Sequence, residues 1–262
     1  MAQNLRIAEK YLSALNLAES PRILGNRALL YGTDDGDLEV FYAPFDHIAT
    51  DAKLVVVGIT PGLTQAVNAY EAVRSALRCG LSLPESLRIA KLTASFSGGI
   101  MRNNLVSLLD AIGVPGLFRI QSTSSLFHPE SEHVHFTSAL RYPVFLGGRN
   151  YNGSPDMLRT PLLREMIETH LAEEARALPE AVWLPLGPKA EAAVLHLVSK
   201  GYLRRNKVLA GMPHPSGANA ERVAVFLGRK DAQRVSRQTN AANLLQARTV
   251  LTGQILSLME AN

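Results

Sequence analysis

A run of four large apolar residues, Leu54-Val55-Val56-Val57, most narrowly limits how this chain can fold. A continuous run of this kind, ended by Gly58-Ile59-Thr60-Pro61-Gly62, is typical of a strand buried on both faces of a sheet. Helices must then cover both faces of that sheet. The run therefore predicts a central strand that opens into a tight loop at its carboxyl end.

Helical and extended patterns alternate along the rest of the 262 residues. The spacing predicts helices at 3–19, 63–79, 84–93, 101–112, 155–178, 188–200, 218–227 and 232–260. It predicts further strands at 117–123, 181–186 and 207–209, and a possible one at 140–146 followed by a long polar loop. Strands on either side of Gly32-Thr33-Asp34-Asp35-Gly36 predict a small N-terminal hairpin. With no linker or repeat, we expect one α/β domain over 1–262.

Composition excludes several classes of protein. Cys79 is the single cysteine, so neither an intramolecular disulfide nor a cysteine-ligated zinc or iron–sulfur site can form within one chain. No HExxH spacing occurs, and we expect no metal and no cofactor. The start of the chain lacks a signal-peptide pattern and no stretch reaches about 18 apolar residues, which predicts a cytoplasmic protein without a membrane segment. A net charge of +4 suits a polyanionic partner without requiring one.

A second loop, Met212-Pro213-His214-Pro215-Ser216-Gly217, follows the short apolar stretch 208–210. Its two prolines hold the histidine on a stiff, extended backbone. Parallel sheets bind ligands beyond the carboxyl ends of their strands, so both loops are expected at one site. The alternative is a structural histidine bonded to a nearby carbonyl. Nucleotide-binding GxGxxG and P-loop motifs and a GxSxG elbow are all absent.

Together the two loops resemble the signature motifs of the uracil-DNA glycosylase superfamily. Residues 58–66 are most similar to the mismatch-specific branch, with Thr60 replacing an asparagine, and His214-Pro215-Ser216 matches branches that keep a catalytic histidine. Phe96 stands where the family places an aromatic ring that stacks on the base. Gln121 and Ser122 stand near the end of a predicted strand, where the family carries an asparagine that reads uracil, and either can be the counterpart.

The resemblance implies a three-layer α/β/α fold with a short, mainly parallel four-stranded central sheet. It implies a monomeric DNA-repair enzyme that hydrolyses the N-glycosidic bond of uracil in single-stranded or duplex DNA. The catalytic residues would be His214 and Thr60. Base-binding residues would be Ile59, Gly62, Phe96, Gln121 and Ser122, and phosphate contacts would come from Thr64, Ser216, Arg222, Arg229 and Lys230.

Departures from the family pattern refine these expectations. A threonine at 60 can hold a water but cannot act as a general base, so catalysis should depend mainly on a neutral His214 that stabilises the departing base. Gly62 lies where the strictest uracil enzymes have a tyrosine that excludes the thymine methyl, which predicts an open wall unless another side chain fills it. Only small or polar side chains follow Ser216, which predicts a preference for single-stranded or weakly paired DNA.

Two other functions stay open at this level. One is a non-hydrolytic member of the fold that binds uracil-containing DNA or traps it covalently through His214. The other is an enzyme that acts on a nucleoside or another small molecule. The basic residues after the second loop have an equally ordinary interpretation as a solvated helix face, and Phe96 as a core aromatic.

Overall fold

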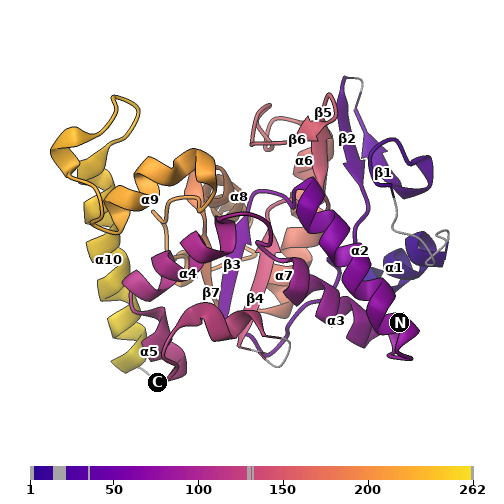
Figure 1. The fold of residues 1–262 in the computed structure, drawn as a ribbon, viewed down its shortest axis with the longest axis horizontal. Helices are drawn as coiled ribbons and strands as arrows, with labels where there is room; N and C mark the ends of the chain where they lie inside the picture. Colours follow the sequence, from indigo (N-terminus) through magenta and orange to yellow (C-terminus); the bar gives the residue numbers. More distant parts are fainter. Residues whose placement is uncertain (1–2, 14–21, 35, 129–130, 132, 261–262) are drawn as a thin grey trace.

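The computed structural model describes residues 3–13, 22–34, 36–128, 131 and 133–260 (Figure 1). Its centre is a parallel sheet with the strand order β4-β3-β7, made of β3 (Leu54–Gly58), β4 (Val134–Ser138) and β7 (Val182–Pro185). Every residue of β3 is buried, as the apolar run predicts. Alternation along the strand sends Val55 and Val57 into one core cluster and Leu54 and Val56 into another.

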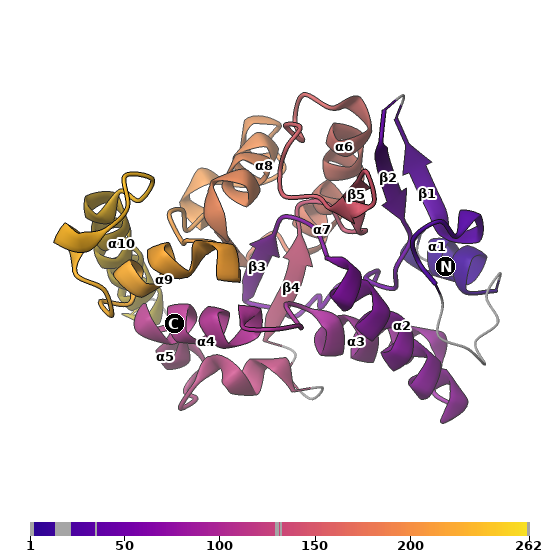
Figure 2. The same ribbon diagram turned by 45° about the horizontal axis from the view of Figure 1, so that its top comes forward.

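Helices cover both faces of this sheet, which confirms the α/β class. On the Val55 face lie α6 (Pro161–Met166), α7 (Ala172–Ala177) and α8 (Gly187–Ser199). On the Leu54 face lie α4 (Met101–Ala111), α5 (Val114–Phe118), α9 (Ala220–Phe226) and α10 (Ala241–Glu260). Figure 2 shows β3 and β4 between α8 and α4. Helices α2 (Leu63–Arg78) and α3 (Leu83–Ala94) pack together beside the sheet.

A second, antiparallel sheet adjoins the first and contains the predicted hairpin. Its order is β1-β2-β5-β6, with β1 (Leu30–Thr33), β2 (Leu38–Phe41), β5 (Val144–Leu146) and β6 (Arg149–Asn150). Asp35 in the predicted hairpin turn lies outside the described residues. Helix α1 (Gln3–Ser13) precedes this sheet, and positions 14–19 of the predicted first helix also lie outside them.

The turn between β5 and β6 consists of Gly147 and Gly148, whose φ angles are +54° and +71°. Two successive positive φ angles are what a tight two-residue hairpin turn requires, and glycine adopts them without steric strain. Part of the predicted polar loop is therefore an ordered hairpin, which returns the chain from Leu146 to Asn150.

The predicted strand at 117–123 is wrong. Gly113, with φ of +89°, leads into α5, and Arg119 ends that helix in a left-handed conformation with φ of +54°. Residues Thr123–Phe127 then form a 3-10 helix. The second parallel strand is instead β4, whose sequence VHFTS has only two apolar residues and was not singled out as a strand.

The fourth strand of the central sheet, expected at 207–209, is not confirmed. Residues Arg205–Lys207 form a 3-10 turn. The segment that follows joins β7 and its end only through isolated bridges, Trp183 to Val208 and Leu186 to Met212. Gly211 between them has φ of +104°, which interrupts the extended conformation that a strand needs.

Two long predicted helices are also divided. The helix expected at 155–178 begins at Pro161 and contains a π-helical turn, Ile167–Leu171, between α6 and α7. The helix expected at 232–260 begins only at Ala241. Within the part of the chain that the structure describes, no helix has the length and apolar character needed to cross a membrane.

Candidate active site

The carboxyl end of β3 opens into a cavity of about 950 Å³. Both predicted loops line it. The first loop contributes Gly58, Ile59, Thr60 and Gly62, and the second contributes Met212, Pro213, His214 and Ser216. The two segments that the sequence separates by about 150 residues therefore form two walls of one cavity.

Three contacts hold the second loop in place. Gly187, at the start of α8, donates its N–H to the carbonyl of Met212 over 2.7 Å. A Cβ on Gly187 would lie 3.1 Å from the Cβ of His214, so glycine is what allows the loop to come this close. On the other side, Nδ2 of Asn104 in α4 donates to the carbonyl of Pro215 over 2.8 Å. The histidine loop is thus anchored to helices on both sides.

His214 is held as a neutral hydrogen-bond donor. The backbone N–H of Ser216 donates to its Nδ1 over 3.3 Å, so in the neutral ring the proton is on Nε2. Burial lowers the pKa of His214 to about 4, because desolvation penalises the charged ring. At neutral pH this loop therefore presents an uncharged N–H group.

The hydroxyl of Thr60 ties the first loop to the second sheet. Its Oγ1 donates to the carbonyl of Tyr142 over 3.0 Å and accepts from the N–H of Val144 over 3.2 Å. The donor proton of Thr60 is therefore used by the protein, and only one acceptor lone pair is left for a water. This position supports the loop and offers no base for water activation.

Phe96 lies at the base of the cavity with its ring against the end of β3. It is 95% buried, has a left-handed φ of +52°, and meets Phe136 edge-on at 5.9 Å. A Cβ on Gly58 would lie 3.1 Å from the Phe96 ring, so glycine at 58 makes room for it. A bulky residue rarely adopts a positive φ, and here the surrounding contacts hold the ring in this place.

Asn150, at the end of β6, fills the gap that Gly62 leaves. The N–H of Leu63 donates to the Oδ1 of Asn150 over 2.9 Å, and the other amide atom, Nδ2, lies next to Gly62. A Cβ on Gly62 would lie 3.3 Å from that Nδ2. Asn150 also lines the cavity. The wall expected to be open is therefore covered by an amide from a distant hairpin.

Gln121 and Ser122 do not line this cavity. Their expected position depended on the strand at 117–123, which does not form. Ser122 instead donates its hydroxyl to the carboxylate of Asp110 over 2.7 Å, and Gln121 is exposed. The end of the second parallel strand is occupied by Ser138, which is paired in register with Gly58 and lines the cavity.

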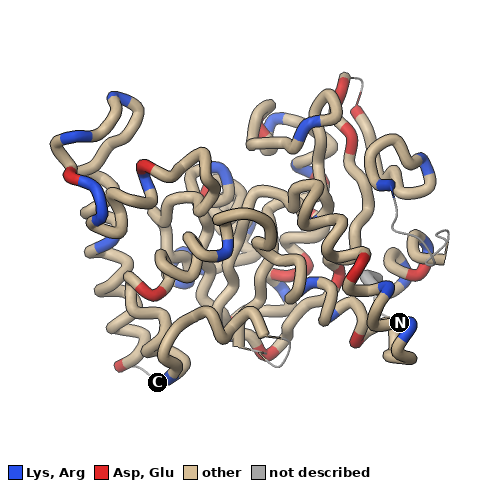
Figure 3. Tube along the Cα trace, viewed as in Figure 1, with Lys and Arg blue, Asp and Glu red and all other residues tan. Residues whose placement is uncertain are grey.

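The predicted phosphate contacts divide into separate groups. Ser216 and Arg222 line the cavity, and Arg222 is held by Oδ1 of Asn219 at 2.6 Å. Lys230 forms an ion pair with Glu221 at 2.6 Å, so part of its charge is balanced inside the protein. Arg229 is exposed on the loop before α10, where Figure 3 shows several basic positions. Thr64 packs beside Gly98, which lies in the loop between α3 and α4.

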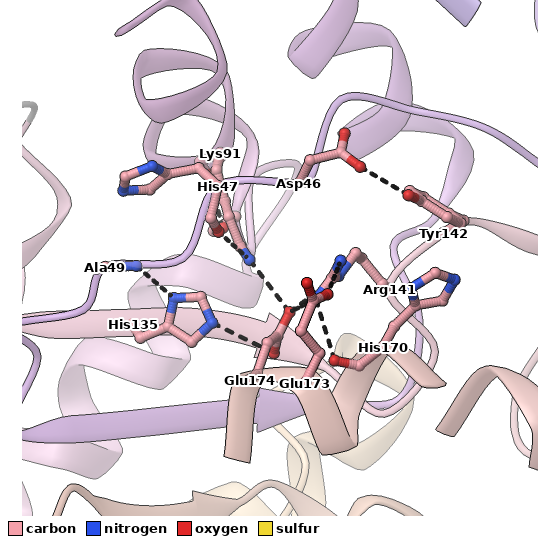
Figure 4. Close-up of polar contacts among 11 residues, drawn as sticks. Asp46, His47, Ala49, Lys91, His135, Arg141, Tyr142, His170, Glu173 and Glu174 are labelled. Atoms are coloured by element: carbon pink, nitrogen blue, oxygen red, sulfur yellow. Dashed lines mark hydrogen bonds and ion pairs between the residues drawn. The ribbon is translucent and has the colours of Figure 1, made fainter. Parts of the chain in front are cut away.

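A buried cluster of charged residues lies behind the cavity, and the sequence patterns gave no sign of it (Figure 4). Glu174 on α7 is fully buried, 3.0 Å from the guanidinium of Arg141 and 3.6 Å from Nζ of Lys91. These cations keep the pKa of Glu174 well below its usual value. Lys91 and Arg141 also border a small gap beneath Phe96 and Ser138, so the cluster supports the base of the cavity.

Nothing among the described residues suggests a metal centre, since no group of three or more histidine, cysteine, aspartate or glutamate side chains could hold an ion. The sequence is similar to the uncharacterized protein YoxB of Bacillus subtilis (strain 168), with 38% identity over 200 residues, which cover 75% of this chain and 78% of the relative. No family model and no solved structure matches the chain.

Proposed function

This chain belongs to the same family as YoxB of Bacillus subtilis, and we propose that it is a monofunctional uracil-DNA glycosylase. It hydrolyses the bond between uracil and deoxyribose and leaves an abasic site for base-excision repair. We place the activity in the cytoplasm, in a monomer that needs no cofactor. Its partner is uracil-containing DNA.

The observation that carries the proposal is the neutral N–H of His214, which lines the cavity at the carboxyl end of β3. When the glycosidic bond breaks, its electron pair moves to the base and negative charge develops on O2 of uracil. A fixed, uncharged donor in a desolvated site stabilises that charge, and donors of this kind contribute about 3–4 kcal/mol in comparable enzymes. Water then adds to C1′ of the sugar and releases its proton to solvent.

The rest of the cavity suits a base that has been rotated out of DNA. Phe96 lines this space and, although 95% buried, is the aromatic ring on which an extruded base would stack. Ser138 and Asn150 line the same space and supply hydrogen-bonding groups for the edge of the base. At about 950 Å³ the cavity exceeds the needs of one base, so the flanking nucleotides also fit, toward Arg222.

The geometry favours hydrolysis over covalent trapping. A trapping histidine needs a free ring lone pair to attack C1′. In His214 the Nδ1 lone pair accepts from the Ser216 N–H and Nε2 carries the proton, so neither nitrogen is available. Among the residues lining the cavity, Glu191 is the acid, and its Oε2 already accepts from the N–H of Gly211 over 3.1 Å. One hydrogen bond leaves a carboxylate with other acceptor positions, so we base the proposed mechanism on stabilisation of the departing base by His214 and not on exclusion of Glu191.

The test is incubation with an end-labelled oligonucleotide that contains one uracil, single-stranded or in duplex, followed by hot alkali. We expect cleavage at the uracil position with both substrates, and none with the thymine control. A protein–DNA adduct stable to denaturation would instead identify the trapping function. Absence of both binding and cleavage, together with release of uracil from free nucleosides, would identify a small-molecule enzyme.

A further inference from the structure

Ile100 is an unusually exposed apolar residue at the rim of the cavity. It is 54% exposed, the highest value among the large apolar residues that the structure describes. It precedes Met101, which lines the cavity, and its Cγ2 lies 3.7 Å from the position that a Cβ on Gly217 would take. Ile100 thus stands beside the loop that carries His214, within van der Waals reach of a side chain at position 217.

The segment that presents Ile100 turns at two glycines and is followed by an anchored helix start. Gly98 and Gly99 have φ angles of +97° and +54°, and a Cβ on Gly98 would lie 3.1 Å from Cγ2 of Thr64. Behind them, Nη2 of Arg102 donates to the carbonyls of Thr93 and Ser95 over 2.8 and 2.7 Å. These hydrogen bonds hold the start of α4 against the end of α3, so the backbone beside Ile100 is placed before DNA binds.

Single exposed apolar residues are common on protein surfaces and need no explanation. Ile100 differs in its position, because it directly precedes the cavity-lining Met101 and lies beside Gly217 in the His214 loop. Asn104, four residues further on, hydrogen-bonds to Pro215 and couples α4 to that loop. An apolar side chain in this place would contact the neighbouring bases when one base leaves the DNA stack and enters the cavity.

We propose that Ile100 is a wedge that enters the base stack of duplex DNA while the target base occupies the cavity. The inference rests on the proposed glycosylase function. Extruding a base from a duplex loses its stacking and pairing, and an inserted apolar side chain offsets that loss by filling the vacated space. The expected single-strand preference therefore gives way to efficient action on duplex DNA.

The experiment compares wild type, Ile100→Ala and Ile100→Leu on the same uracil oligonucleotide, single-stranded and in duplex. We expect Ile100→Ala to lose about tenfold to a hundredfold in rate on duplex and to change little on single strands. Ile100→Leu should recover most of the duplex rate. The matched control is Leu256→Ala, which removes a side chain that is 52% exposed on α10 and should alter neither rate. Equal losses on both substrates, or no loss on duplex, would overturn the wedge.

A second measurement separates failure of the wedge from failure of the proposed function. A duplex with 2-aminopurine next to the uracil reports local unstacking by fluorescence without any cleavage. Wild type should raise this fluorescence on binding, and Ile100→Ala should raise it less at saturation. An enzyme that releases no uracil but shows this difference would retain the wedge and lose the glycosylase assignment. Equal fluorescence from both proteins would reject the wedge regardless of activity.

Discussion

The N–H of Ser216 and Nδ1 of His214 form a hydrogen bond of 3.3 Å within a single loop. This bond determines which ring nitrogen carries the proton, because a neutral imidazole with Nδ1 as acceptor must be protonated at Nε2. The prolines on either side keep the two groups in register. A short local contact therefore converts an amphoteric side chain into a donor of fixed direction.

Removing the His214 ring should affect catalysis far more than removing the Thr60 hydroxyl. We expect His214→Ala to lower the rate of uracil release by about 10²–10³, the loss seen when one oxyanion donor is removed. Thr60→Ala removes the link to Tyr142 and Val144 and should lower the rate less than about tenfold. Single-turnover rates on a uracil oligonucleotide measure both, with Thr60→Ser as the control that keeps the hydroxyl. Comparable losses for the two alanine variants would refute this order.

Acid should destabilise the fold as the pH falls from about 6.5 toward 5. Burial lowers the pKa of His135 and His214 to about 4, and of His47 and His170 to about 3. The unfolded chain binds these protons near pH 6.5 and the folded chain does not. Stability is therefore complete above about pH 6.5 and falls by up to about 1.4 kcal/mol per pH unit for each histidine below it. Urea unfolding at pH 7, 6 and 5 measures the change, and pH-independent midpoints would contradict it.

Asn150 should limit which bases enter the cavity. Asn150→Ala uncovers Gly62, so the rate on uracil carrying a bulky 5-substituent should rise relative to the rate on uracil by about tenfold. Asn150→Asp is the matched control, since it keeps the size and the acceptor for the Leu63 N–H but removes the amide donor. We expect it to retain discrimination by size and to lose rate on uracil itself. An unchanged substrate ratio in Asn150→Ala would show that another group forms this wall.

Glu174 should be essential to stability in a way that a surface ion pair is not. Glu174→Gln leaves Lys91 and Arg141 without their buried counter-charge, and losses of about 3–5 kcal/mol follow from breaking such pairs. Glu180→Gln makes the same substitution in an exposed pair with Arg204 and should cause only a small fraction of that loss. Chemical denaturation of the two variants gives the comparison. Equal stabilities would mean that the buried cluster is not a net structural requirement.

Arg222 and Lys230 should contribute unequally to DNA binding. Arg222 lines the cavity, whereas Lys230 is paired with Glu221. Arg222→Ala should reduce the slope of log binding constant against log salt by about one, and Lys230→Ala should reduce it by less. Fluorescence anisotropy with a labelled oligonucleotide between about 50 and 200 mM salt measures these slopes. A larger effect at Lys230 would reverse the assignment.

Features of the site that depend on short segments were predictable from sequence. The apolar run at 54–57 is a buried strand, and the loops after it and around His214 line one cavity. The expectation for Gln121 and Ser122 failed because Gly113 and Arg119 bend the chain into a short helix there. Apolar residues such as Leu117 and Phe118 fit a strand and a buried helical turn equally well, and length alone did not separate the two.

The sequence by itself determined the central strand, the helices on both sides of it and the two loops, because each depends on residues that are neighbours in the chain. Only the tertiary structure decided that Asn150 covers Gly62, that Ser138 ends the second strand, and that Ile100 stands against Gly217. Only the tertiary structure, likewise, brings together the buried charges of Glu174, Lys91 and Arg141. These contacts join segments far apart in the chain, and no local pattern of hydrophobicity or turn residues encodes which distant side chain will fill a given space.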